Sequence, residues 1–102
     1  MPKLLLFYVP CKDEAETLHL SKLLLDNKLV ACTNSMPIKS CYFWQGNIEN
    51  DNEHVLIVKT LPEKAKEVSL FIEQHHSYDI ACIAFWKIKV NEHYFEWAKN
   101  QL

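Results

Sequence analysis

Two adjacent histidines, His75 and His76, and one cysteine, Cys11, are the residues of this chain best suited to chemistry. Neutral imidazoles suit Cu(II), whereas a thiolate favours Cu(I). Adjacent side chains diverge in regular structure, but at a helix end the backbone can turn so that both imidazoles reach one site. The pattern therefore predicts a copper site of His75, His76 and Cys11. The alternative is a histidine cation stabilised by the dipole at a helix C-terminus, with Cys11 as a loop thiol that has no function.

A second group of residues suits a small ligand. Lys59 ends an apolar run, where its ammonium can pair with a carboxylate, bind a small anion, or extend along the apolar surface into solvent. Trp44 and Tyr78 can line a cleft between subunits, although aromatic residues on strands are more often packing residues. Cys32 lies in an apolar run and is either a core or interface residue or part of the same cleft. The second hypothesis is therefore a ligand-binding cleft at Cys32, Trp44, Lys59 and Tyr78.

The composition excludes several kinds of site. All eleven basic residues are lysines, so no guanidinium is present for bidentate recognition of phosphate or guanine. Gly46 is the only glycine, which excludes the glycine-rich phosphate loops. The net charge of −2 argues against general binding to nucleic acid or to an anionic membrane. No serine lies in a strained turn motif, and no catalytic triad is recognisable. We therefore do not expect an enzyme.

The cysteines indicate a reducing compartment. Cys11, Cys32, Cys41 and Cys82 are scattered and contain no C-x-x-C pair, so we expect free thiols. The apolar run before Pro10 is shorter than the hydrophobic region of a secretory signal, and no stretch approaches the length of a transmembrane helix. The sequence therefore predicts a cytoplasmic protein.

Hydrophobic periodicity predicts the elements of the first half of the chain. Leu4–Val9 is a continuous apolar run, typical of a central strand covered on both faces. Asp13 and Glu16 form a capping box that opens a helix running to about Lys28. The apolar stripe of this helix is expected at Ala15, Leu18, Leu24 and Leu25, widened by Leu20 and Leu23.

The second half completes the fold. Leu29–Trp44 is an extended segment in which Pro37 requires a bulge or bend, and residues 50–52 mark the end of a turn after Gly46. Residues 55–58 form another apolar strand, and Thr60 with Glu63 predicts a capped helix that ends near His75. Residues 84–90 alternate as a fourth strand, and a short helix follows Asn91.

This order predicts a ferredoxin-like α+β fold over a single domain, residues 1–102. The β-α-β-β-α-β arrangement forms a four-stranded antiparallel sheet with two helices on one face, followed here by a C-terminal helix. The long hairpin strands and the aromatic pair Phe85 and Trp86 suggest that the uncovered face of the sheet meets another subunit.

Several motifs together resemble the CutA family of divalent-cation tolerance proteins over nearly the whole chain. The motifs are Asp13-Glu14-Ala15, Leu29-Val30-Ala31-Cys32-Thr33-Asn34 with Pro37, Tyr42-Phe43-Trp44-Gln45-Gly46-Asn47-Ile48, Ile57-Val58-Lys59-Thr60, His76-Ser77-Tyr78-Asp79 and Tyr94-Phe95-Glu96-Trp97. The resemblance implies a homotrimer whose sheets continue between chains, copper binding, and a role in the response to metal ions. It also implies an architecture like that of the PII signalling proteins. The alternative function is therefore a regulatory or scaffold trimer that binds a small anion in intersubunit clefts.

Three positions depart from the family pattern. Ser77 stands where relatives usually have proline, and Ala81-Cys82 replaces a usual Pro-Glu pair. Some members place a copper-binding cysteine at the position of Val9, two residues before Cys11. His75 and His76 are therefore the better-supported part of the predicted metal site.

Overall fold

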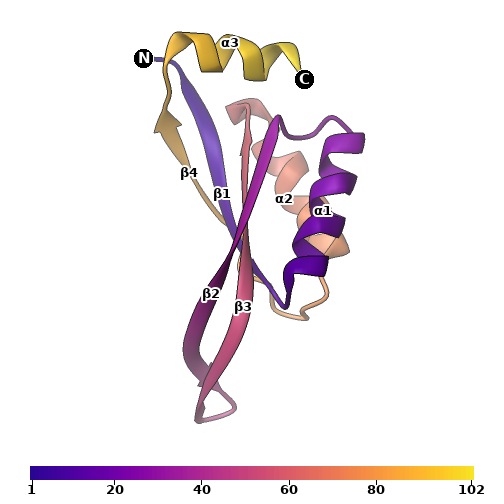
Figure 1. Ribbon diagram of the computed structural model, residues 1–102, viewed down its shortest axis with the longest axis vertical. Helices are drawn as coiled ribbons and strands as arrows, with labels where there is room; N and C mark the ends of the chain where they lie inside the picture. Colours follow the sequence, from indigo (N-terminus) through magenta and orange to yellow (C-terminus); the bar gives the residue numbers. More distant parts are fainter.

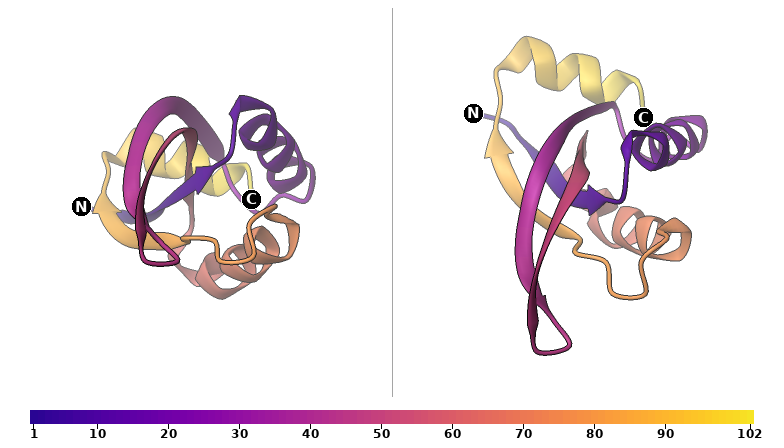
Figure 2. Two further views of the ribbon diagram at one scale, coloured as in Figure 1. Left: turned by 90° about the horizontal axis from the view of Figure 1, so that it is seen from below. Right: turned by 60° about the horizontal axis from the view of Figure 1, so that its bottom comes forward.

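The computed structural model describes residues 1–102 and contains one sheet and three α-helices. The strands pair antiparallel in the order β2-β3-β1-β4. Helices α1 and α2 cover one face of the sheet, and α3 lies across one end (Figures 1 and 2). The predicted order is confirmed; the elements are β1 (Lys3–Cys11), α1 (Glu14–Asp26), β2 (Cys32–Trp44), β3 (Asn47–Thr60), a 3-10 turn (Pro62–Lys64), α2 (Ala65–His75), β4 (Ala84–Lys89) and α3 (Glu92–Asn100). None of these helices is long and apolar enough to cross a membrane.

The core lies between the sheet and the two helices. Strand β1 is central, as its continuous apolar run predicts, and pairs with β3 on one side and β4 on the other. Its side chains at Phe7 and Val9 are fully buried in the main core with Leu24 of α1 and Ile72 of α2. Leu4 is also fully buried but belongs to a smaller cluster under α3. Strand β1 is therefore central as predicted, but the expected cover on both faces is wrong for the subunit, because Leu6, Tyr8 and Pro10 on its other face are only half-buried.

Helix α1 begins as predicted, but its buried face differs from the expected one. The backbone N–H of Glu16 donates to Asp13 Oδ1 at 2.9 Å, which confirms the Asp13 half of the predicted capping box, whereas the Glu16 carboxylate accepts from Lys12 and not from Asp13. Leu18 and Leu25 are 59% and 43% exposed, whereas Leu20 and Leu24 are fully buried. Because leucines occur around much of α1, the hydrophobic periodicity alone did not identify which face of the helix packs against the sheet.

The second predicted capping box does not form. The hydroxyl of Thr60 donates to the carbonyl oxygen of Leu29 at 2.6 Å instead of capping a helix. The 3-10 turn separates Thr60 from α2, and no side chain caps either element. Thr60 instead ties the end of β3 to the segment that follows α1.

The β2–β3 hairpin is more regular than predicted. Strand β3 is longer than the expected strand at residues 55–58, whereas β2 begins at Cys32 and not at Leu29. Gln45 and Gly46 form its two-residue turn with φ of +50° and +83°, the conformation that a type I′ turn requires. Residues 50–52 therefore lie within β3 and not in the turn. The pairing runs without a bulge through Pro37, which is tolerated because β2 is an edge strand.

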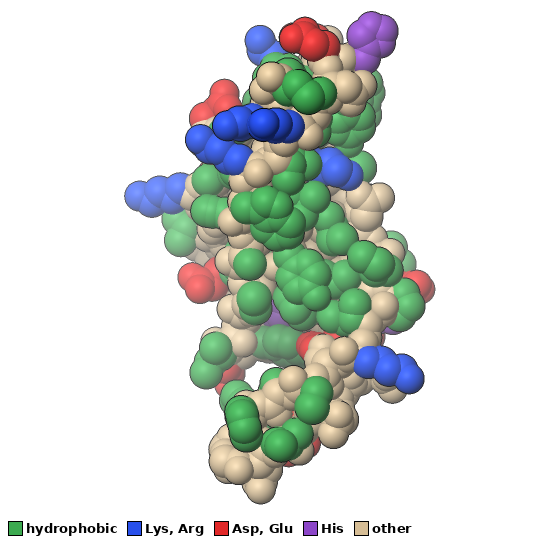
Figure 3. Space-filling view, turned by 90° about the vertical axis from the view of Figure 1, so that its left-hand side faces the viewer, with side chains coloured by type: hydrophobic (Ala, Val, Ile, Leu, Met, Phe, Trp, Pro, Cys, Tyr) green, Lys and Arg blue, Asp and Glu red, His purple; other side chains and the backbone are tan.

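The outer part of the hairpin, residues 38–53, pairs only with itself because β1 reaches no further than His54 on β3. We call this part the arm; Figure 1 shows that it projects beyond the rest of the molecule. Hydrophobic side chains gather on the face of the molecule away from α1 and α2 (Figure 3). Met36 and Trp86 are 49% and 51% exposed. Contact of this open face with another subunit stays a prediction.

Candidate functional site

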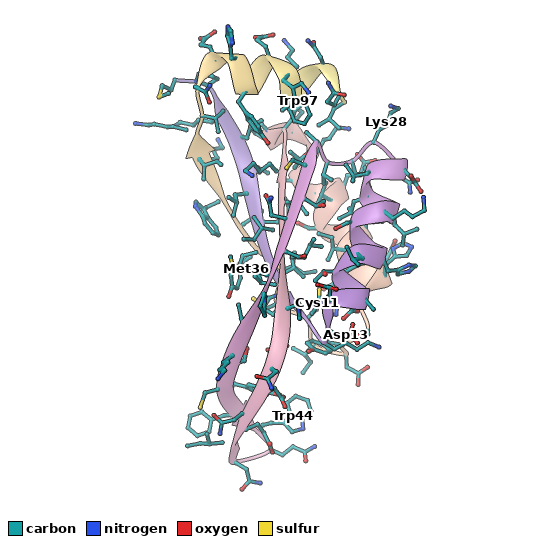
Figure 4. The ribbon with its side chains drawn as sticks, in the orientation of Figure 1. Cys11, Asp13, Lys28, Met36, Trp44 and Trp97 are labelled. Atoms are coloured by element: carbon teal, nitrogen blue, oxygen red, sulfur yellow. The ribbon has the colours of Figure 1, made fainter.

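Three side chains that can bind a metal lie close together at the N-terminal end of α1. The ligand atoms of Cys11, Glu16 and His76 all lie within 4.8 Å of one another. Cys11 ends β1, Glu16 lies in the first turn of α1, and His76 follows the last residue of α2. Figure 4 shows the labelled Cys11 close to the start of this helix. The fold therefore brings together three segments that are distant in sequence.

His76 uses both ring nitrogens in hydrogen bonds to the backbone. The backbone N–H of Tyr78 donates to Nδ1 at 3.0 Å, so Nδ1 carries no proton in this arrangement. Nε2 then carries the proton and donates to the carbonyl oxygen of Pro10 at 2.9 Å. The imidazole is completely buried. His76 therefore joins the loop after α2 to the end of β1.

The Glu16 carboxylate also connects the end of β1 with the loop after α2, through two hydrogen bonds. Its Oε1 accepts from the backbone N–H of Lys12 at 3.1 Å, and its Oε2 accepts from the backbone N–H of Ser77 at 2.8 Å. Burial alone would raise the pKa of Glu16, but these hydrogen bonds outweigh burial and lower it. The structure therefore favours the ionised carboxylate. The capping-box signal had placed Glu16 at this turn, but only as a helix cap.

Cys11 holds its proton. The thiol is fully buried and donates to the carbonyl oxygen of Val9 at 3.5 Å. Burial, followed by the charges of Glu16, Glu53 and Asp13, raises the pKa of Cys11 to about 12. The sulfur is therefore a neutral thiol at neutral pH, whereas a metal requires the thiolate.

The donor types fit a divalent transition metal, because thiolate, imidazole and carboxylate are all common ligands of such ions. The described hydrogen bonds, however, already use Nδ1 and Nε2 of His76 and both oxygens of Glu16. A metal ion would displace the Tyr78 N–H from the imidazole and the proton from Cys11. The cluster can thus act as a metal site only after a local rearrangement.

The predicted histidine pair separates at the end of α2. The helix ends at His75 as predicted, and His76 continues in an extended conformation with φ −77° and ψ 144°. Nδ1 of His75 lies 2.8 Å from the carbonyl oxygen of Phe71 in its own helix, and its ring stacks on Phe71. His75 is exposed and lies outside the cluster. The third ligand residue of the cluster is therefore Glu16, and the prediction that His75 belongs to the site is wrong for this structure.

The four predicted cleft residues fall into two groups. Trp44 and Tyr78 line one surface groove of about 840 Å³ between the arm and the loop before β4. Cys32 and Lys59 are paired at the opposite end of the hairpin. Trp44 lies twelve positions after Cys32 along an extended strand, which corresponds to roughly 40 Å. Within one subunit these residues do not form a single site.

Lys59, in the group of predicted cleft residues near α3, already has contacts within the subunit. Lys59 Nζ donates to Asn34 Oδ1 at 3.1 Å and lies 5.9 Å from the centre of the Tyr94 ring. Burial and the adjacent Cys32 raise the pKa of Tyr94 to about 12. No carboxylate of the subunit pairs with Lys59.

The fold and the site together define a ferredoxin-like α+β subunit with a buried thiol–carboxylate–imidazole cluster. Residues 5–101 match the family described as CutA1 divalent ion tolerance protein, and the chain belongs to this family.

Relatives and solved structures agree over most of the chain. The divalent-cation tolerance protein CutA of Archaeoglobus fulgidus is 46% identical over 74 residues, covering 72% of this chain and 71% of that protein. The CutA of Thermotoga maritima is 32% identical over 100 residues, covering 97% and 99%. A solved structure of the Archaeoglobus fulgidus protein, described there as periplasmic, has a TM-score of 0.92, 34% identity, and coverage of 96% and 97%. CutA1 from Ehrlichia chaffeensis has a TM-score of 0.93, 28% identity, and coverage of 99% and 96%.

Proposed function

We propose that this divalent-cation tolerance protein works as a cytoplasmic homotrimer that binds divalent cations, copper first among them, in the response to metal ions. The observation that carries the proposal is the convergence of the ligand atoms of Cys11, Glu16 and His76 within 4.8 Å. Family membership supports the same role. The proposal assigns no catalytic step to the chain.

Metal binding at the cluster should depend on pH. Because the pKa of Cys11 is raised to about 12, the ion must displace the thiol proton at neutral pH. The apparent affinity should therefore rise with pH, by up to about tenfold per pH unit for one released proton.

We expect a stoichiometric copper site that depends on the cluster. Competition titrations against buffered chelators with Cu(I) and Cu(II) should show at least about tenfold weaker binding in Cys11→Ser and His76→Gln, because each variant loses one ligand atom. The matched control is His75→Ala, since this neighbouring imidazole lies outside the cluster. Equal affinity in the wild type and both cluster variants would remove the proposed site.

The trimer has its own support. The outer edges of the two edge strands, β2 and β4, are unpaired, and the open face exposes Trp86 and Met36. Unpaired sheet edges can pair with another chain, and large exposed apolar patches mark interaction surfaces.

Light scattering should give about three times the chain mass of 12.0 kDa for the wild type. Trp86→Asp should shift the mass toward one chain, because the open face would then have to bury a charge. Leu18→Asp, on the exposed side of α1, is the control that should keep the trimer. A monomeric wild type, or a trimer unaffected by Trp86→Asp, would contradict this arrangement.

The second candidate function is a regulatory or scaffold trimer that binds a small anion in an intersubunit cleft. The absence of a carboxylate partner for Lys59 within the subunit favours it. A thermal-shift screen of nucleotides and carboxylates tests it, since a bound ligand raises the melting temperature. A flat response, with Lys59→Ala behaving as the wild type, would argue against this function.

A further inference from the structure

We propose that the groove between the arm and the loop before β4 binds a small organic cation, such as a quaternary ammonium or a protonated amine with an apolar body. This inference is independent of the metal cluster and opposite in charge to the predicted anion cleft. The groove has a volume of about 840 Å³, which is within the range of small-molecule sites.

The charges that line the groove all have one sign. Glu49, Glu53 and Asp79 contribute carboxylates, and no lysine or histidine lies in the lining. None of the ion pairs of the chain involves these three residues. The groove therefore offers negative charge that the subunit does not neutralise.

Glu53 is the strongest single indication of a cation. Glu53 is only 8% exposed, and its carboxylate accepts a hydrogen bond from the Tyr78 hydroxyl at 2.5 Å. A buried carboxylate without a cationic partner is costly. A bound cation would lower this cost and would use the oxygen that Tyr78 leaves free.

Aromatic side chains complete the site. Tyr42, Phe43, Trp44 and Tyr78 lie in the same lining as the carboxylates. The face of an aromatic ring attracts a cation, and tryptophan does so most strongly. Trp44 is 48% exposed in the subunit although it is a large apolar residue, so within the subunit its ring is open to a ligand.

A bare metal ion fits this groove less well than an organic cation. Cys41 and Cys82 also line the groove, so donors of several types are present. The only group of three or more such donors that converges on one point is Cys11, Glu16 and His76. The groove residues are therefore too far apart to chelate one ion together, whereas a larger cation with an apolar body can span them.

Choline titrated into the metal-free protein, with calorimetry or ligand-observed NMR as the readout, tests the inference. We expect saturable binding of choline, and at least tenfold weaker binding of its neutral carbon isostere, dimethylbutanol. Glu53→Gln should weaken choline binding about tenfold, and Trp44→Leu about threefold to thirtyfold. Glu53→Gln keeps an acceptor for the Tyr78 hydroxyl, so the result does not depend on the folding of Trp44→Leu.

Two matched controls separate the groove from general effects. Glu92→Gln removes one carboxylate from α3, and Trp97→Leu removes a tryptophan that is 45% exposed on the same helix. Both should bind choline as the wild type does. Equal binding of choline and its neutral isostere, equal weakening in the controls, or no saturable binding to the wild type because a neighbouring subunit fills the groove, would each overturn the proposal.

Discussion

Replacing Phe7 by alanine should lower the free energy of unfolding by about 3–5 kcal/mol, the usual cost of removing a buried phenylalanine ring. Phe7 lies in the central strand, is fully buried, and belongs to the main core. Its ring meets Phe85 of β4 edge-to-face with the centroids 4.8 Å apart, so this aromatic contact is also lost. Chemical unfolding at one fixed chain concentration measures the effect, since the stability of an oligomer depends on concentration.

Two further variants show whether the loss comes from the cavity. Phe7→Leu fills most of the volume and should cost clearly less than Phe7→Ala. Leu18→Ala removes an apolar side chain that is 59% exposed on α1, and its effect should stay within about 0.5 kcal/mol. A loss below about 1 kcal/mol for Phe7→Ala would mean that the core around β1 repacks or is not the one described.

Replacing Glu16 by alanine should cost about 2–5 kcal/mol. The carboxylate accepts two partly buried hydrogen bonds, from the backbone N–H groups of Lys12 and Ser77, and each such donor left without an acceptor costs about 1–3 kcal/mol. Glu16→Gln should cost about 1–3 kcal/mol, because the amide oxygen can accept from only one of the two donors. Unfolding of the metal-free protein at neutral pH measures both losses.

The contribution of Glu16 should also depend on pH. Its pKa in the folded protein is lowered from the ordinary value of 4.5, so its stabilisation is present above that value. The stabilisation should disappear as the pH falls through the lower pKa of the folded state. The difference in free energy of unfolding between the wild type and Glu16→Gln should therefore shrink on acidification.

Glu14→Gln is the matched control for both measurements. Glu14 is an exposed carboxylate in the same first turn of α1, so it shares the helix dipole but makes no contact between segments. Its substitution should change stability by only a few tenths of a kcal/mol. Should Glu16→Ala cost no more than Glu14→Gln, the hydrogen bonds from Lys12 and Ser77 would not be holding the two segments together.

The elements of this fold were predictable because their signals are local. The apolar run Leu4–Val9 identified the central strand, and Asp13 identified the start of α1. The face that α1 buries and the hydrogen bond from Thr60 to Leu29 were not predictable in the same way. Both depend on which partner lies opposite, and the sequence pattern of a single element does not contain that information.

By itself, then, the sequence determined the family, the order of the strands and helices, and the end of α2 at His75. Only the tertiary structure decided that His76 turns inward while His75 stays in solvent. The inward turn depends on the carbonyl oxygen of Pro10, which lies 66 residues away in the chain. Tertiary structure likewise placed Glu16 beside Cys11, and it separated Trp44 from Lys59. A site assembled from distant segments is fixed by how β1, α1 and the end of α2 pack together, and no local pattern specifies that packing.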